Sequence, residues 1–160
     1  MQYADLLIRQ YRDKGILVDT NLMLLVLVGQ YNVSRIATFK RTKKYTPMIY
    51  EIVIHVISQF KKRLTTPQIM TEVDNLSRNL RTDEWQSISG ALNELIPTYA
   101  EVATPTAILS LHRLHSAIGL TDCSIMNVPD VLVFMDDLPL YHRLETLGRG
   151  AINLGHLLLS

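Results

Sequence analysis

The chain has 160 residues, of which 48% are hydrophobic and 19% are charged, and its formal net charge is +1 at pH 7. This length is enough for one substantial core but too short for two ordinary domains, and the apolar composition excludes a disordered or low-complexity chain. The near-neutral charge excludes a general attraction to nucleic acid, so nucleic-acid binding would require a local basic patch.

The sequence favours a cytoplasmic protein. Cys123 is the single cysteine and cannot form an internal disulfide, which is typical of a reducing compartment. The longest unbroken apolar run, residues 22–28, is far shorter than the roughly 20 residues that cross a bilayer. The first ten residues include Asp5 and Arg9, so they lack the continuous apolar segment of a signal peptide. We therefore expect no membrane partner.

The N-terminal part of the chain predicts a helix, a strand and a second helix. Residues 2–13 have the spacing of a short amphipathic helix that ends at Gly15. Residues 15–19 are a short apolar run closed by Asp19, the pattern of a strand buried on both faces of a parallel sheet. Helix-forming residues 22–27 follow, so we expect a strand-to-helix turn just after Asp19.

Helical segments dominate the middle of the chain. A basic stretch at residues 40–44 precedes them, and residues 65–67 predict a brief extended piece. Apolar periodicity together with proline and threonine start signals predicts the elements that follow. We expect helices at residues 47–60, 68–80, 84–95 and 107–117, and a short helical turn that begins at Thr121 and Asp122.

A second strand with an acidic end follows near the C-terminus. Residues 131–135 are wholly apolar and are followed by Asp136 and Asp137, and residues 151–154 predict a last, shorter strand. Strands separated by long helical stretches indicate an α/β fold with a mainly parallel central sheet flanked by helices. We find no interdomain linker.

The acidic residues at these strand ends are candidate site residues. In open α/β sheets, functional sites lie beyond the carboxyl ends of the strands. Taken singly, Asp19 is better explained as a helix cap or turn residue. Asp136 and Asp137, which precede Pro139, have a similar structural explanation as turn residues. Both explanations stay open at this point.

Two further acids lie beside apolar helix faces. Glu72 falls three residues after Ile69 and four before Leu76, on the flank of the apolar face. A carboxylate that leans toward a core is costly unless it is paired or bound to a cation, although a position at the rim of the core explains it as well. Asp122 lies three residues before the apolar Ile125 and so also flanks an apolar helix face. A role as a helix cap explains its position equally well.

Four carboxylates gathered at one end of a sheet would repel one another, which raises their pKa values and weakens the fold. A divalent cation removes this conflict. Mg²⁺ and Mn²⁺ prefer oxygen ligands, and Mg²⁺ commonly keeps several waters while it binds one or two carboxylates and phosphate oxygens. The histidine and cysteine spacing of a zinc site is absent, since the histidines are scattered.

Four short motifs carry these acids in chain order: residues 16–21 with Asp19, residues 66–73 with Glu72, residues 119–122 with Asp122, and residues 131–137 with Asp136 and Asp137. Their order and spacing resemble the PIN-domain nucleases from about residue 15 to 154. In the family's register Asp137 is the fourth acid and Asp136 the variable position. Met135 stands where the family usually has Thr or Ser. In this chain a helix at 2–13 comes before the first strand, whereas in the family the first strand normally begins close to the N-terminus.

This resemblance implies one PIN-like domain at residues 15–160, preceded by a helical extension at residues 1–14. It implies a Mg- or Mn-dependent ribonuclease that hydrolyses phosphodiester bonds, as toxins of toxin–antitoxin pairs and RNA-processing enzymes do. The implied catalytic and metal-binding residues are Asp19, Glu72, Asp122 and Asp137, with Asp136 as a further candidate ligand and with Thr20 and Asn21 holding a ligand or water beside them. The implied partners are RNA and an antitoxin or immunity protein, and the added helix suggests a docking or homodimer element.

The basic segment is a candidate nucleic-acid contact. It contains Lys40, Arg41, Lys43 and Lys44 and is flanked by Phe39 and Tyr45. The cations would hold a phosphate backbone and the aromatic rings would stack on a base. A solvated charged loop is the structural alternative.

Two other functions remain open. A catalytically degenerate PIN-like binding or scaffold module is favoured by Met135, which removes a hydroxyl that would orient a ligand or water and so lowers the expected activity. A phosphoryl-transfer hydrolase that uses Asp19 as its nucleophile is the third, and Glu72 has no role in it.

Overall fold

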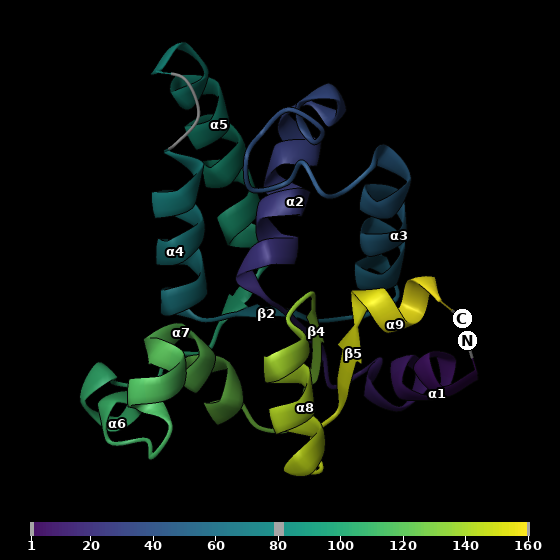
Figure 1. Ribbon diagram of the computed structural model, residues 1–160, viewed down its shortest axis with the longest axis vertical. Coiled ribbons are helices and arrows are strands. Elements are labelled where there is room, and N and C mark those ends of the chain that lie inside the picture. The colour runs from purple at the N-terminus through teal and green to yellow at the C-terminus, as the bar shows by residue number, and fades with distance from the viewer. Residues whose placement is uncertain (1, 79–81, 160) are drawn as a thin grey trace.

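Five short parallel strands form one sheet at the centre of the molecule (Figure 1). The computed structural model describes residues 2–78 and 82–159. The strands lie in the order β3-β2-β1-β4-β5. Their bounds are β1 (Ile16–Val18), β2 (Arg63–Thr65), β3 (Ala100–Glu101), β4 (Leu132–Met135) and β5 (Ala151–Asn153). Every residue of β1 and β4 is buried, as expected for inner strands covered on both faces. The predicted α/β class with a parallel sheet is confirmed.

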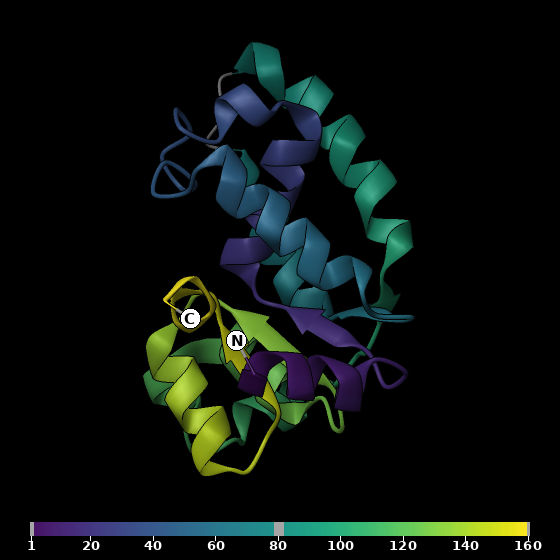
Figure 2. The ribbon, with the colours of Figure 1, turned by 90° about the vertical axis from the view of Figure 1, so that its right-hand side faces the viewer.

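Helices cover both faces of this sheet. They are α1 (Gln2–Tyr11), α2 (Thr20–Tyr31), α3 (Pro47–Ser58), α4 (Pro67–Ser77), α5 (Thr82–Leu95), α6 (Thr106–Ser110), α7 (His115–Asn127), α8 (Leu138–Thr146) and α9 (Leu154–Leu158). Figure 2 shows α2 to α5 on one side of the strands, with α1, α7 and α8 on the other. Short 3₁₀ turns occur at Val33–Arg35 and Ile96–Thr98. Residues 79 and 80 of the helix predicted at 68–80 lie outside the described residues.

Helix α2 lies among the helices α3, α4 and α5 on one side of the sheet. It is apolar on all sides, as expected for a helix enclosed by others. It contacts α3, α4 and α5, and the described structure buries nearly all of its residues between Thr20 and Gly29. A Cβ at Gly29 would stand 2.4 Å from the ring of Tyr50 on α3, so only glycine permits this close approach. The helix is therefore held in place along most of its length.

Several sequence-based element predictions are wrong in detail. The single helix predicted at residues 107–117 is interrupted: α6 ends at Ser110, and the chain turns before α7 begins at His115. In this turn the backbone N–H of Leu114 donates to Nδ1 of His112 at 3.2 Å, which satisfies a group outside a regular helix. The last strand ends one residue before its predicted end, because Leu154 begins α9.

Candidate functional site

A cavity of about 270 Å³ opens at the carboxyl ends of β1 and β4. Four carboxylates from four separate segments line it: Asp19, Glu72, Asp122 and Asp137. Thr20, Asn21, Arg41, Leu76, Ile125 and Leu140 complete the lining. We call this space the acidic cavity. The structure thus brings together the four acids, Thr20 and Asn21 that the sequence singled out, and leaves Asp136 outside.

Asp19 is both a helix cap and a cavity residue. It follows β1, and its backbone N–H donates to the carbonyl of Phe134 at 3.0 Å, which joins it to β4. Its Oδ1 accepts from the N–H of Leu22 at 2.8 Å and its Oδ2 accepts from the N–H of Asp136 at 3.0 Å. The side chain is only 3% exposed. Burial raises the pKa of Asp19 to about 7, the neighbouring carboxylates add to the rise, and the two hydrogen bonds oppose it.

Glu72 reaches the cavity from α4. Its carboxylate is half-buried, and Oε2 accepts from the hydroxyl of Thr20 at 2.9 Å, which joins α4 to the N-terminus of α2. The first turn of α4 is fixed by the hydroxyl of Thr66, which caps the helix at the N–H of Ile69 and lies 2.8 Å from the hydroxyl of Ser124 on α7. The helices that carry the second and third acids are therefore joined by a buried hydrogen bond.

Asp122 comes from the second part of α7. Gly119 interrupts this helix with φ of +80°, a conformation that glycine adopts most readily. Asp122 follows in the half-buried start of the next helical section. The pKa of Asp122 is raised to about 6, first by burial and then by the carboxylates of Asp137 and Glu72, while Arg143 opposes the rise. The acids of this cavity are thus close enough to repel one another.

The adjacent acids after β4 diverge. Asp137 lines the acidic cavity and caps α8, with Oδ1 accepting from the N–H of Leu140 at 2.7 Å. Asp136 is held by the basic segment instead: its Oδ2 accepts from the hydroxyl of Tyr45 at 2.6 Å and pairs with Nζ of Lys44 at 2.6 Å. Asp137 is therefore the member of the pair that is available to the cavity.

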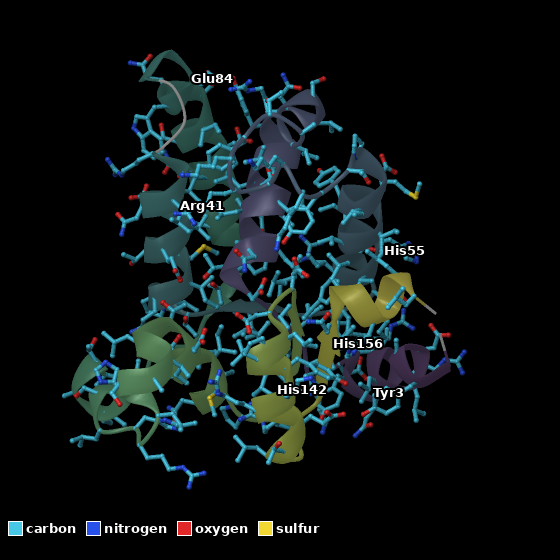
Figure 3. The ribbon with its side chains drawn as sticks, viewed as in Figure 1. Tyr3, Arg41, His55, Glu84, His142 and His156 are labelled. Carbon is cyan, nitrogen blue, oxygen red and sulfur yellow. The ribbon has the colours of Figure 1, made fainter. Side chains whose placement is uncertain are left out.

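The basic segment folds as a tight surface loop. Phe39, Thr42 and Tyr45 point inward and are at most 4% exposed, and the Thr42 hydroxyl donates to the carbonyl of Ile36 at 2.8 Å. The expectation that Phe39 and Tyr45 stack on a base is wrong, because this three-residue spacing places both rings in the core. The four cations Lys40, Arg41, Lys43 and Lys44 are exposed. Arg41 lies beside α4 in Figure 3 and lines the acidic cavity.

The donor set of the acidic cavity consists of oxygen atoms, which suits a hydrated Mg²⁺ or Mn²⁺ ion. In the described part of the chain, no three His, Cys, Asp or Glu side chains are grouped closely enough to enclose a metal by themselves. Mg²⁺ usually keeps several waters and takes only one or two carboxylates directly, with substrate oxygens completing its shell. Burial is the main cause of the raised pKa values of Asp19 and Asp122, and the neighbouring carboxylates add a smaller repulsion that such an ion would relieve.

No protein-family model, curated protein or solved structure matches this chain. Among the helices of the described residues, none combines the length and the apolar character that crossing a membrane requires.

Proposed function

We propose that this chain is a PIN-like nuclease that uses Mg²⁺ or Mn²⁺ to hydrolyse phosphodiester bonds, with RNA as the first substrate to test. The observation that supports the proposal is the meeting of four carboxylates, from β1, α4, α7 and the end of β4, around one cavity at the carboxyl edge of a parallel sheet. Sites in open α/β sheets lie at this edge. Repelling acids around an open cavity are costly unless they serve a cation.

The roles of the residues follow from their contacts. Of the four acids that line the cavity, one or two would hold the cation directly, and the others would contact it through its waters. A bound cation would supply an activated water and would neutralise charge on the phosphate. The two backbone hydrogen bonds to Asp19 fix its orientation before substrate arrives, which avoids reorganisation during the reaction. Arg41 at the same cavity would contact a phosphate oxygen.

A binding module without catalysis is the second candidate. Met135 favours it, because the side chain that ends β4 is fully buried and provides no hydroxyl next to Asp137. The third function, nucleophilic attack by Asp19, is disfavoured. The carboxylate is almost inaccessible and both of its oxygens already accept hydrogen bonds.

A cleavage assay tests the proposal. Labelled single-stranded RNA and DNA are incubated with the purified protein and Mn²⁺, Mg²⁺ or chelator. We expect cleavage with metal, none with chelator, and at least a tenfold loss in Asp137→Asn. Asp130→Asn is the matched control, because this aspartate is exposed and pairs with Lys14 away from the cavity. RNA binding without cleavage would support the binding module. Cleavage that persists at full rate in Asp137→Asn would contradict the assignment of the site.

A further inference from the structure

A second cavity, of about 180 Å³, lies between the turn that precedes α7, the C-terminal end of α7 and the C-terminal end of α8. Its polar lining includes Arg113 and Arg143, and its apolar lining includes Leu114, Met126 and Leu147. No carboxylate lines it. We call this space the arginine cavity. It combines cationic groups with an apolar wall, the composition of a site for an anion attached to an organic group.

The two arginines have no directly paired acid among the described residues. Elsewhere on the described surface, several basic side chains pair with acids: Lys14 with Asp130, Arg35 with Glu84, Lys44 with Asp136, Lys61 with Asp13, and Arg78 with Asp74. Arg113 and Arg143 form no ion pair with any described residue; Arg113 is exposed, whereas Arg143 is half-buried and therefore partly desolvated. A partly desolvated guanidinium without a close anion is a favourable place for a phosphate, which it contacts through two parallel N–H groups.

The arginine cavity is next to the acidic cavity. On α8, Leu140 lines the acidic cavity and Arg143, almost one turn later, lines the arginine cavity. On α7, Ile125 lines the acidic cavity and the adjacent Met126 lines the arginine cavity. The three-residue step from Leu140 to Arg143 rises about 4.5 Å along α8, so the two cavities are neighbours along this helix. The charge of Arg143 also lowers the pKa of Asp122, as expected for two groups that lie near each other.

We propose that the arginine cavity is a nucleotide subsite, in which Arg113 and Arg143 bind a phosphate of a single strand whose neighbouring phosphate occupies the acidic cavity. The sugar or base of that nucleotide contacts Leu114, Met126 and Leu147. This inference rests on the proposed nuclease function for the identity of its ligand. With Arg41 on the side of the basic segment, it places cations on two sides of the acids.

Binding of a short fluorescein-labelled single-stranded RNA, measured by anisotropy in chelator from about 50 to 200 mM salt, tests the subsite without requiring cleavage. Arg113→Gln and Arg143→Gln should each raise Kd at least tenfold at low salt. The double variant Arg113→Gln/Arg143→Gln should also reduce the slope of log K against log salt by about 0.7, the value for one phosphate contact in a single strand, and each single variant should reduce it by less. Arg143→Lys should keep the slope and weaken binding, because lysine retains the charge but not the paired N–H groups.

Arg9→Gln on α1 is the matched control, since Arg9 is exposed and lines neither the acidic cavity nor the arginine cavity. RNA binding by this variant should have the same salt slope as binding by the wild type. The subsite is overturned if the Gln variants behave like this control, if Arg143→Lys loses as much slope as Arg143→Gln, or if the wild type binds no RNA. The nuclease proposal is judged separately by metal-dependent cleavage. If the Gln variants change the salt slope but the protein cleaves no RNA, the subsite is supported and the nuclease proposal is rejected. If the protein cleaves RNA but the Gln variants leave the slope unchanged, the nuclease proposal is supported and the subsite is rejected.

Discussion

Replacement of Asp19 by asparagine should make the folded protein more stable relative to wild type as pH rises. Asp19 is buried, and in the metal-free fold its pKa is raised from 3.8 to about 7. The folded state therefore holds a proton that the unfolded chain has already released. Wild-type stability is lost as pH rises from 3.8 to about 7, and the loss is constant above that value. An asparagine at the same position carries no charge and has no such loss.

The magnitude follows from the pKa. One pKa unit corresponds to 1.36 kcal/mol, so the wild type loses about 3 kcal/mol of unfolding free energy between pH 5 and about pH 7. The Asp19→Asn variant would also lose one hydrogen bond, because an amide N–H₂ cannot accept from the backbone N–H of Asp136. This loss costs roughly 1–3 kcal/mol and is nearly independent of pH. The stability of Asp19→Asn minus that of wild type should therefore rise by about 3 kcal/mol between pH 5 and pH 8.

Urea unfolding of both proteins in chelator, followed by circular dichroism at pH 5 and pH 8, measures this difference. The contribution of Asp122 is present in both proteins and cancels. Asp130→Asn is the control, since its side chain is 67% exposed and lies outside the acidic cavity. A difference for Asp19→Asn that stays constant within about 0.5 kcal/mol between the two pH values would refute the reasoning.

Three further predictions concern the site and the core. Asp137→Asn should reduce kcat/KM for RNA cleavage at least tenfold, about 1.4 kcal/mol, with a smaller effect in Asp136→Asn, because only Asp137 lines the acidic cavity; the opposite ranking would move the site by one residue. In chemical unfolding, Gly29→Ala should cost about 1–3 kcal/mol because its Cβ would meet an aromatic ring at 2.4 Å, whereas Gly90→Ala, with nothing within 4 Å, should gain about 0.5–1 kcal/mol. Equal effects would contradict this packing. Mg²⁺ at a hundred times its Kd should stabilise the wild type at pH 8 by about 2.7 kcal/mol, measured as a rise in Tm, and an unchanged Tm would contradict the metal site.

The inner strands and the grouping of the acids could be predicted from the sequence because burial on both faces leaves a clear pattern. β1 and β4 are unbroken apolar runs closed by aspartates, and parallel strands bring their carboxyl ends to one edge. β3 has only two residues, both exposed, so no apolar pattern marks it. The sequence-based interpretation of Pro139 as part of a turn misses α8, although a capping Asp137 followed by proline in the first helical turn is also a helix start signal.

Other features depend on contacts between distant residues. The bond from Tyr45 to Asp136 spans 91 positions, and no local pattern shows that it withdraws Asp136 from the cavity. The inward positions of Phe39 and Tyr45 are detectable, since together with Thr42 they repeat every third residue. The relation of Arg143 to Asp122 depends on how α7 packs against α8, so no pattern in the sequence marks the arginine cavity.

The enclosure of α2 has a consequence for the motions of the protein. A helix surrounded by α3, α4 and α5 cannot open while its neighbours remain packed, so its backbone amides should exchange with deuterium only through global unfolding. α6 is a five-residue helix with one buried side chain, and its amides should exchange through small local openings. Because Asp19 caps the enclosed helix, the first acid of the site belongs to the slowest-exchanging part of the molecule, and its position persists through the fluctuations that loosen the periphery.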